Sequence, residues 1–172
     1  MVAFSYRGSE PAEQHKALLE AALRRDADAA VATLLVHVNN CVEHALGVSF
    51  ANADVEWEGR VVSAHHKLAS TDRLMENGLG ELEQWKRYDG EFHQALISNC
   101  GSRTLMEMHA LVFDKYFRYQ MVAFSYRGSE PAEQHKALLE AALKRDAKAA
   151  TATLRTHVNN CVEHALATAS LK

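Results

Sequence analysis

The sequence predicts an all-α protein, an antiparallel bundle of about seven helices, and three observations support this fold class. Alternating Val, Ile and Thr patterns, which are typical of strands, are absent from the 172 residues. The two prolines, Pro11 and Pro131, stand near the starts of helical segments, where a missing backbone N–H costs little. The few glycines mark breaks between these segments, and the short connections predict antiparallel neighbours.

Local signals place the ends of these helices. Asp26 and Asp146 are predicted to cap two helix starts, while Asn77-Gly78 and Gly101 close others. The stretch 47–53, which begins with a glycine, is predicted to break the chain. The predicted helices cover about residues 11–23, 26–46, 55–75, 82–99, 104–126, 131–143 and 146–167.

Residues 1–46 return almost unchanged as residues 121–166, so the last two predicted helices are duplicated at the start of the chain. The five differing pairs are Arg24/Lys144, Asp28/Lys148, Val31/Thr151, Leu35/Arg155 and Val36/Thr156. Natural repeats usually diverge further, which leaves a very recent natural duplication or an engineered one, and the pattern of the differences favours the engineered one.

The differences between the copies also follow a pattern. Positions 24, 28, 31 and 35 are spaced by four, three and four, and therefore form one stripe of a helix. The stripe ends in apolar residues in the first copy and in polar residues in the second. We therefore expect one set to be buried and the other to be exposed to water. The expected buried residues are Val31, Leu35 and Val36, and the expected exposed ones are Thr151, Arg155 and Thr156.

Composition excludes several classes of protein. With 48% hydrophobic and 24% charged residues, the chain is predicted to fold as one domain over residues 1–172. A net charge of −3 argues against binding to nucleic acid, and no apolar run is long enough for a membrane span. The three cysteines form no close pair, and no signal peptide is recognisable, which favours reduced thiols and a cytoplasmic location.

One carboxylate and three imidazoles form a candidate metal site. Asp89 and His93 are four residues apart, so they share one helix face and can grip one cation, although a solvated pair is an alternative. His135 and His157 lie among apolar residues of predicted helices. A histidine that faces the core needs a partner, and it is often a core residue that forms a hydrogen bond. Together the four suit a divalent ion such as Zn²⁺ or Ni²⁺, with coordination positions left open.

Three runs of sequence carry a resemblance to a known family. They are Asp89-x-x-Phe-His93-x-x-Leu96, Glu133-x-His135-x-x-Leu138, and Arg145-Asp146-Ala147-x-x-Ala150 followed by His157-Val158. In order and spacing they resemble the FadR-type C-terminal ligand-binding (FCD) domain of GntR-superfamily transcription regulators. The resemblance covers about residues 54–167 as an FCD-like core, with residues 1–46 as a duplicated helical hairpin.

The resemblance implies an antiparallel helical bundle that holds a divalent metal, with a small organic acid bound over it. Carried over to this sequence, the implied metal ligands are Asp89, His93, His135 and His157. Arg118 resembles a position that reaches the effector pocket, where a guanidinium could pair with a carboxylate; the alternative is a surface arginine.

The duplication supplies His15 and His37 as alternative metal ligands, within this chain or to a neighbouring copy. Because the chain has one Asp89/His93 pair, we expect one complete site.

The sequence also departs from the family pattern. The winged helix-turn-helix that the family places before this domain is missing, and the duplicated pair of helices stands where the family's first helix is expected. Residues 42–46 and 49–54 resemble the end of that first helix, so the helix predicted at 26–46 is expected to take its place. The helix at 11–23 then has no counterpart in the family.

The function favoured by these features is the metal-dependent sensing of a small organic acid by a dimerising domain of a GntR/FadR-type regulator. Such a domain is not an enzyme, is expected to form a homodimer, and here would lack its DNA-binding part. A metal-dependent hydrolase is one alternative, because an open metal site can activate water. Against it, no general base accompanies the ligands and no GxSxG motif is present. A designed helical scaffold without native activity is the other alternative.

Overall fold

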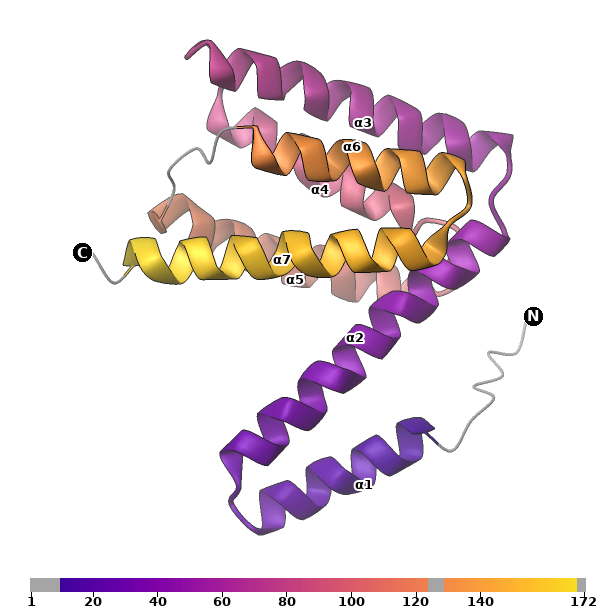
Figure 1. Ribbon diagram of the computed structural model, residues 1–172, viewed down its shortest axis with the longest axis vertical. Helices are drawn as coiled ribbons and strands as arrows, with labels where there is room; N and C mark the ends of the chain where they lie inside the picture. The colour runs from indigo at the N-terminus through magenta and orange to yellow at the C-terminus, as the bar shows by residue number, and fades with distance from the viewer. Residues whose placement is uncertain (1–9, 124–128, 170–172) are drawn as a thin grey trace. The chain divides into compact units, whose positions relative to one another are not determined.

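The structure is a computed structural model that describes the backbone of residues 10–123 and 129–169, and the side chains of 12–34, 36–37, 40–114, 129–164 and 167. Across these residues the chain forms helices and no strands, which confirms the all-α prediction. The described helices are α1 (Glu10–Leu23), α2 (Ala27–Ala51), α3 (Val55–Glu76), α4 (Leu82–Leu96), α5 (Arg103–Ala123), α6 (Glu130–Leu143) and α7 (Ala147–Ala169) (Figure 1).

The chain divides into two compact units, Met1–His44 and Ala45–Lys172. We call the first the N-terminal hairpin; it contains α1 and most of α2. We call the second the bundle; it contains the last turns of α2 and helices α3 to α7. No helix in the described part of the chain is long and apolar enough to cross a membrane.

The helices of the bundle form a closed ring. Helix α3 packs against α4 and α6, α5 packs against α4 and α7, and α6 and α7 pack against each other. Helices that follow one another in the bundle run antiparallel (Figure 1). The ring encloses the core, whose large, fully buried apolar side chains are Leu46, Trp57, Val61, Leu68, Phe92, Leu96 and Leu138.

The predicted helix ends agree with the structure where their signals are local. Gly78 adopts φ +69°, a left-handed conformation that suits glycine, and it lies directly after Asn77, the C-cap of α3. At the start of α7, the carboxylate of Asp146 accepts a hydrogen bond from the backbone N–H of Ala149 at 2.9 Å. Asp26 caps α2 in the same way, through Ala29 at 3.0 Å.

The chain does leave the helix within the predicted break at 47–53, but later than expected, because α2 continues through Gly47 to Ala51. Leu46, Ser49 and Phe50 are buried there, and the Phe50 ring lies edge-on to Trp57 with their centroids 5.2 Å apart. A glycine inside a helix costs about 1 kcal/mol, whereas burying a Leu or Phe side chain contributes about 1.5–3 kcal/mol. Packing of the last turns of α2 therefore outweighs the local preference of the glycine.

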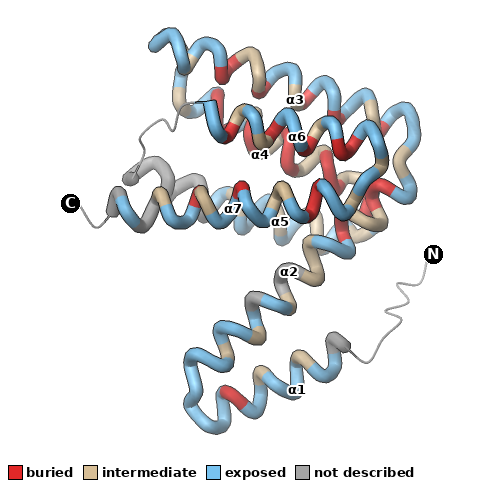
Figure 2. Tube along the Cα trace, viewed as in Figure 1, coloured by how far each residue is buried: buried red, intermediate tan, exposed pale blue. Residues whose placement is uncertain are grey.

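The expected burial of the apolar stripe is also wrong. Val31 and Val36 are 57% and 52% exposed, and the side chain of Leu35 lies outside the described residues. In the second copy Thr151 is buried, although Arg155 and Thr156 are exposed as expected. Ala21 is the single buried residue among the described side chains of the hairpin (Figure 2).

Candidate metal centre

Four buried side chains from three helices converge inside the bundle. Asp89 and His93 come from α4, His135 from α6 and His157 from α7. Each offers one potential ligand atom, and these atoms all lie within 4.8 Å of one another. The structure thus brings together the four residues that the sequence singled out, and such a cluster can hold a metal ion.

Oδ1 of Asp89 lies close to two imidazole nitrogens without forming a hydrogen bond to either. Nε2 of His135 is 3.1 Å from Oδ1 of Asp89, and Nε2 of His93 is 3.5 Å from the same oxygen. Nevertheless, among the described residues, Asp89 Oδ1 and both ring nitrogens of His135 are buried with no hydrogen-bond partner, so these approaches lack hydrogen-bond geometry. Buried polar atoms without partners are rare, and a cation bound between them would satisfy them.

A further contact orients the fourth side chain. Nδ1 of His157 lies 2.8 Å from the amide oxygen of Gln134 on α6. Because an amide oxygen can only accept, Nδ1 carries the proton and Nε2 keeps the lone pair that a metal requires. The sulfur of Cys161 lies 3.8 Å from this Nε2. Sequence reasoning missed Gln134, whose only signal was its position next to His135.

The electrostatics of the cluster favour an ionised carboxylate. Burial opposes ionisation of Asp89, but the nearby imidazoles of His135 and His93 outweigh it and hold the pKa of the carboxyl well below its usual range. By contrast, burial raises the pKa of Asp72 on α3, although the indole N–H of Trp85 donates a hydrogen bond to it and opposes the rise. Asp89 is therefore the carboxylate suited to a cation.

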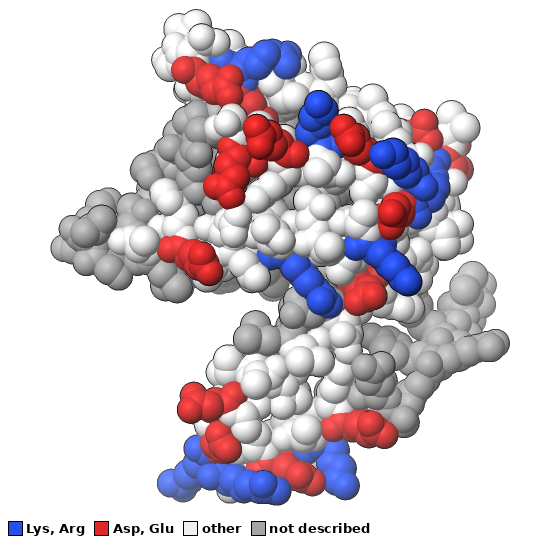
Figure 3. Space-filling model, viewed as in Figure 1, with Lys and Arg blue, Asp and Glu red and all other residues white. Residues whose placement is uncertain are grey.

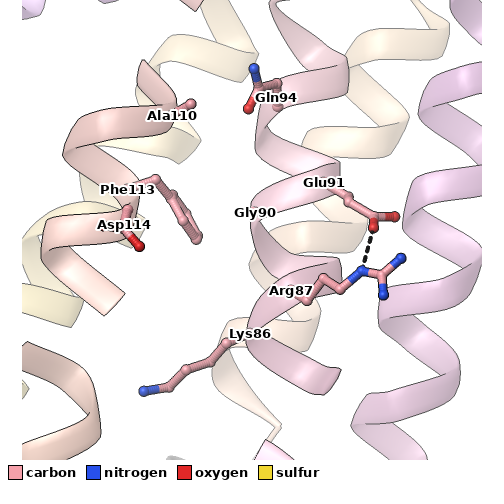
Figure 4. A pocket seen from close by; sticks show the side chains of 8 residues that line it. All are labelled: Lys86, Arg87, Gly90, Glu91, Gln94, Ala110, Phe113 and Asp114. Atoms are coloured by element: carbon pink, nitrogen blue, oxygen red, sulfur yellow. Dashed lines mark hydrogen bonds and ion pairs between the residues drawn. The ribbon is translucent and has the colours of Figure 1, made fainter. Parts of the chain in front are cut away.

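A cavity of about 470 Å³ opens beside α4, on the side that faces α5. The side chains that line it are Lys86, Arg87, Gly90, Glu91, Gln94, Ala110, Phe113 and Asp114 (Figure 4). The Phe113 ring also lies 6.2 Å from that of His93, so Phe113 borders both the cavity and the metal centre.

Lys86 is the one residue of this lining that is fully buried. Burial lowers the pKa of its ammonium to about 8, even though the charge of Asp89 acts in the opposite direction. Lys86 and Asp89 are three residues apart and therefore share one helix face, which is a signal for Lys86 that the sequence contains.

The alternative ligands His15 and His37, and also His65, lie outside this cluster. His15 and His37 belong to the N-terminal hairpin, where their ring centroids are 4.9 Å apart. The ring of His65 packs edge-on against Phe92, with a centroid separation of 5.3 Å. The side chain of Arg118, the expected effector-binding residue on α5, lies outside the described residues.

Surface charge shows no basic stripe on the face that Figure 3 presents, where Lys and Arg side chains alternate with Asp and Glu. This mixed surface agrees with the net charge of −3.

Comparison with known proteins places this chain in a family. The FCD domain model matches residues 43–160. Two curated relatives are an uncharacterised HTH-type transcriptional regulator, BphR of Paraburkholderia xenovorans (strain LB400), and the HTH-type transcriptional repressor GlaR of Escherichia coli (strain K12). The chain is 36% identical to the first over 123 residues and 28% identical to the second over 119 residues.

These alignments cover 69% and 66% of this chain, but 49% and 54% of the relatives, so the chain spans about half the length of the curated relatives it matches. No solved structure matches the chain. None of these comparisons supports an engineered origin for the repeat. Because the family model covers well over half of the sequence, the chain belongs to the FCD domain family and is related to the GntR-type HTH transcriptional regulators.

Proposed function

We propose that this chain is the metal-dependent sensing domain for a small organic acid in a GntR-type transcription regulator. The observation that carries the proposal is the buried cluster of one Asp and three His, with its unpartnered atoms on Asp89 and His135. The relatives are transcriptional regulators, which supports a sensing role over an enzymatic one. A regulator of this kind acts beside the chromosome, so we also place it in the cytoplasm, as a homodimer.

Asp89, His93, His135 and His157 would hold one divalent ion, with Zn²⁺ or Ni²⁺ best suited to three nitrogen ligands and one oxygen. A single carboxylate cannot neutralise a divalent cation. The loaded centre therefore keeps positive charge in a buried site, where electrostatic attraction is weakly screened. That charge favours an anionic effector, and a carboxylate can occupy a coordination position that the four side chains leave open.

Lys86 and Arg118 are the proposed partners for the rest of the acid. Lys86 is buried beside the cavity between α4 and α5, and its ammonium is close enough to Asp89 to interact with that charge. Arg118 belongs to α5, a neighbour of both α4 and α7 in the ring. A guanidinium binds carboxylates in a bidentate manner, which would add selectivity for acids.

Titration calorimetry with Zn²⁺ and Ni²⁺, after treatment with a chelator, tests the metal centre. We expect one binding site per chain, and we expect His93→Ala to weaken it at least about 100-fold because a chelate loses one of its four ligands. His66→Ala is the matched control, because it removes an exposed histidine from α3. Equal affinity in the wild type and in His93→Ala would refute the assignment.

A thermal-shift screen of small mono- and dicarboxylic acids tests the sensing role. Because a ligand at 100 times its Kd stabilises the folded state by about 2.7 kcal/mol, a true effector should raise Tm clearly. We expect this rise with the metal-loaded protein and its loss in excess chelator. A rise of the same size in both conditions would show that the acid does not bind at the metal.

A further inference from the structure

We propose that the N-terminal hairpin can take the place of α6 and α7 in the bundle, and that it does so in a second copy of this chain. We call the space that α6 and α7 fill in the bundle the groove. In that position His15 and His37 would join the Asp89 and His93 of the copy that receives them. The docking follows from the packing of the repeated segment, whereas the exchange of metal ligands rests on the proposed function.

The two copies of the repeat have the same local geometry. Nδ1 of His37 lies 2.9 Å from the amide oxygen of Gln14, which matches the 2.8 Å between His157 and Gln134. The paired histidine rings are 4.9 Å apart in the hairpin and 4.7 Å apart in the bundle. The hairpin therefore already has the shape of the segment that the groove accepts, and docking requires little reordering.

The residues through which α6 packs against the bundle have mostly exposed counterparts in the hairpin. His135, Leu138 and Ala142 are all buried against the bundle. Their counterparts in the first copy differ: His15 and Ala22 are exposed, and Leu18 is only partly covered. Figure 2 shows this contrast as buried positions along α6 and α7 and mostly exposed positions along α1 and the part of α2 that belongs to the hairpin. The hairpin thus exposes the residues whose counterparts in α6 pack against the rest of the bundle.

The five differences between the copies do not obstruct docking. In the bundle the residues at four of these positions are exposed, namely Lys144, Lys148, Arg155 and Thr156. The fifth, Thr151, is buried, and its hydroxyl donates to the backbone oxygen of Ala147 in its own helix at 2.8 Å. Val31 has nearly the same shape and would place a methyl group where that hydroxyl lies. The groove would therefore bury a more apolar side chain than it does now.

Charge complementarity also favours docking of the hairpin in the place of α6 and α7. In the bundle, Nη2 of Arg145 lies 2.7 Å from Oε2 of Glu58, and its guanidinium stacks over the Trp57 ring at 5.1 Å. The counterpart of Arg145 is Arg25, which has the same left-handed backbone, with φ 55° against 58°. Arg25 can therefore make the same ion pair with the Glu58 of another copy.

A second copy is the proposed partner because each chain carries one such groove and two hairpins that fit it. When the hairpin of one chain replaces α6 and α7 of another, the number of filled grooves does not change, as in domain swapping. A tethered segment has an effective concentration in roughly the millimolar range, so α6 and α7 of the same chain usually win. We therefore expect docking between copies when the protein is concentrated or when α6 and α7 are weakened.

The first test removes the metal ligands of the second copy. We expect the His135→Ala/His157→Ala variant to keep a Zn²⁺ site whose occupancy rises with protein concentration and which sediments as a dimer. Adding His15→Ala and His37→Ala should weaken binding by well over about 100-fold, because two imidazoles are lost. Adding His93→Ala to the His135→Ala/His157→Ala variant should also weaken Zn²⁺ binding, because His93 on α4 is one of the ligands of the shared ion. Retained binding in either control, or zinc bound to a monomer, would overturn the proposal.

The second test needs no metal and is run in excess chelator. Leu138→Asp disrupts the packing of α6 against the bundle. We expect the hairpin of a second copy to replace α6 and α7, so that the variant keeps cooperative unfolding and its helix content as a dimer. The Leu18→Asp/Leu138→Asp variant should lose both cooperative unfolding and helix content, whereas Leu18→Asp alone should stay folded and keep the oligomeric state of the wild type. Equal loss of structure in the single and double variants would overturn docking. If this test succeeds while the wild type binds no metal, the proposed function fails and docking stands.

Discussion

Arg145 links the turn before α7 to α3, and its removal gives a quantitative test of how the repeat is held in the bundle. Its guanidinium pairs with Glu58 at 2.7 Å and stacks over Trp57 at 5.1 Å. Arg25 occupies the same position in the first copy, with φ 55° against 58°. We therefore compare Arg145→Ala with Arg25→Ala, because any backbone effect of replacing an arginine at positive φ is common to both variants.

The expected loss follows from these contacts. The ion pair is partly exposed, so it contributes about 0.2–1 kcal/mol, and a cation–π contact of this kind adds about 0.5–1 kcal/mol. Arg145→Ala should therefore lower the free energy of unfolding of the bundle by about 1–2 kcal/mol. Arg25→Ala should leave it unchanged at low micromolar concentration, where each bundle keeps its own α6 and α7 seated.

Urea unfolding followed by tryptophan fluorescence is the appropriate assay, because the two tryptophans, Trp57 and Trp85, both lie in the bundle. We expect a lower midpoint with an unchanged slope for Arg145→Ala. Combination with Glu58→Ala should reveal a coupling energy of about 0.5–1 kcal/mol. An equal loss for both arginine variants, or no coupling with Glu58, would refute the reasoning.

Two further predictions concern α4 and α5. Burial lowers the pKa of His109 to about 4. Between pH 6.5 and 4 the unfolded chain therefore takes up a proton that the folded chain does not, and the free energy of unfolding falls by up to about 3 kcal/mol as the pH is lowered. Urea unfolding at a series of pH values should show a shallower fall for His109→Phe, and an unchanged fall would contradict this assignment. Gly90→Ala should cost up to about 2 kcal/mol in thermal unfolding, because its Cβ would lie 2.9 Å from a Phe113 ring carbon and the overpacking, about 1–3 kcal/mol, exceeds the gain in helix propensity, about 1 kcal/mol. Gly59→Ala on α3, where a Cβ would meet nothing within 4 Å, should stabilise the protein by about 0.5–1 kcal/mol. A loss of stability at Gly59, or none at Gly90, would contradict the packing.

Features determined by neighbouring residues could be predicted from the sequence. The Asp146 cap and the Asn77-Gly78 ending depend on local backbone preferences, which act in the same way in any fold. The helix spacing of Asp89 and His93 fixed their common face. The addition of His135 and His157 relied on the family resemblance, because no local rule brings α6 and α7 against α4.

Features determined by packing between distant segments could not be predicted. At Gly47 the local preference for a break was outweighed by burial of the surrounding turns of α2. At Val31 an apolar residue indicated a core position, but its side chain is more than half exposed. Gln134 and Lys86 acquire their surroundings only when α6 meets α7 and α4 meets α5.

The most direct test of the central claim is an anomalous-scattering map from crystals grown with Zn²⁺ and measured at the zinc absorption edge. We expect one strong peak per bundle at the centre formed by Asp89, His93, His135 and His157, with ligand distances of about 2.0–2.2 Å. Absence of a peak at these four side chains, or zinc bound elsewhere while they remain empty, would contradict it.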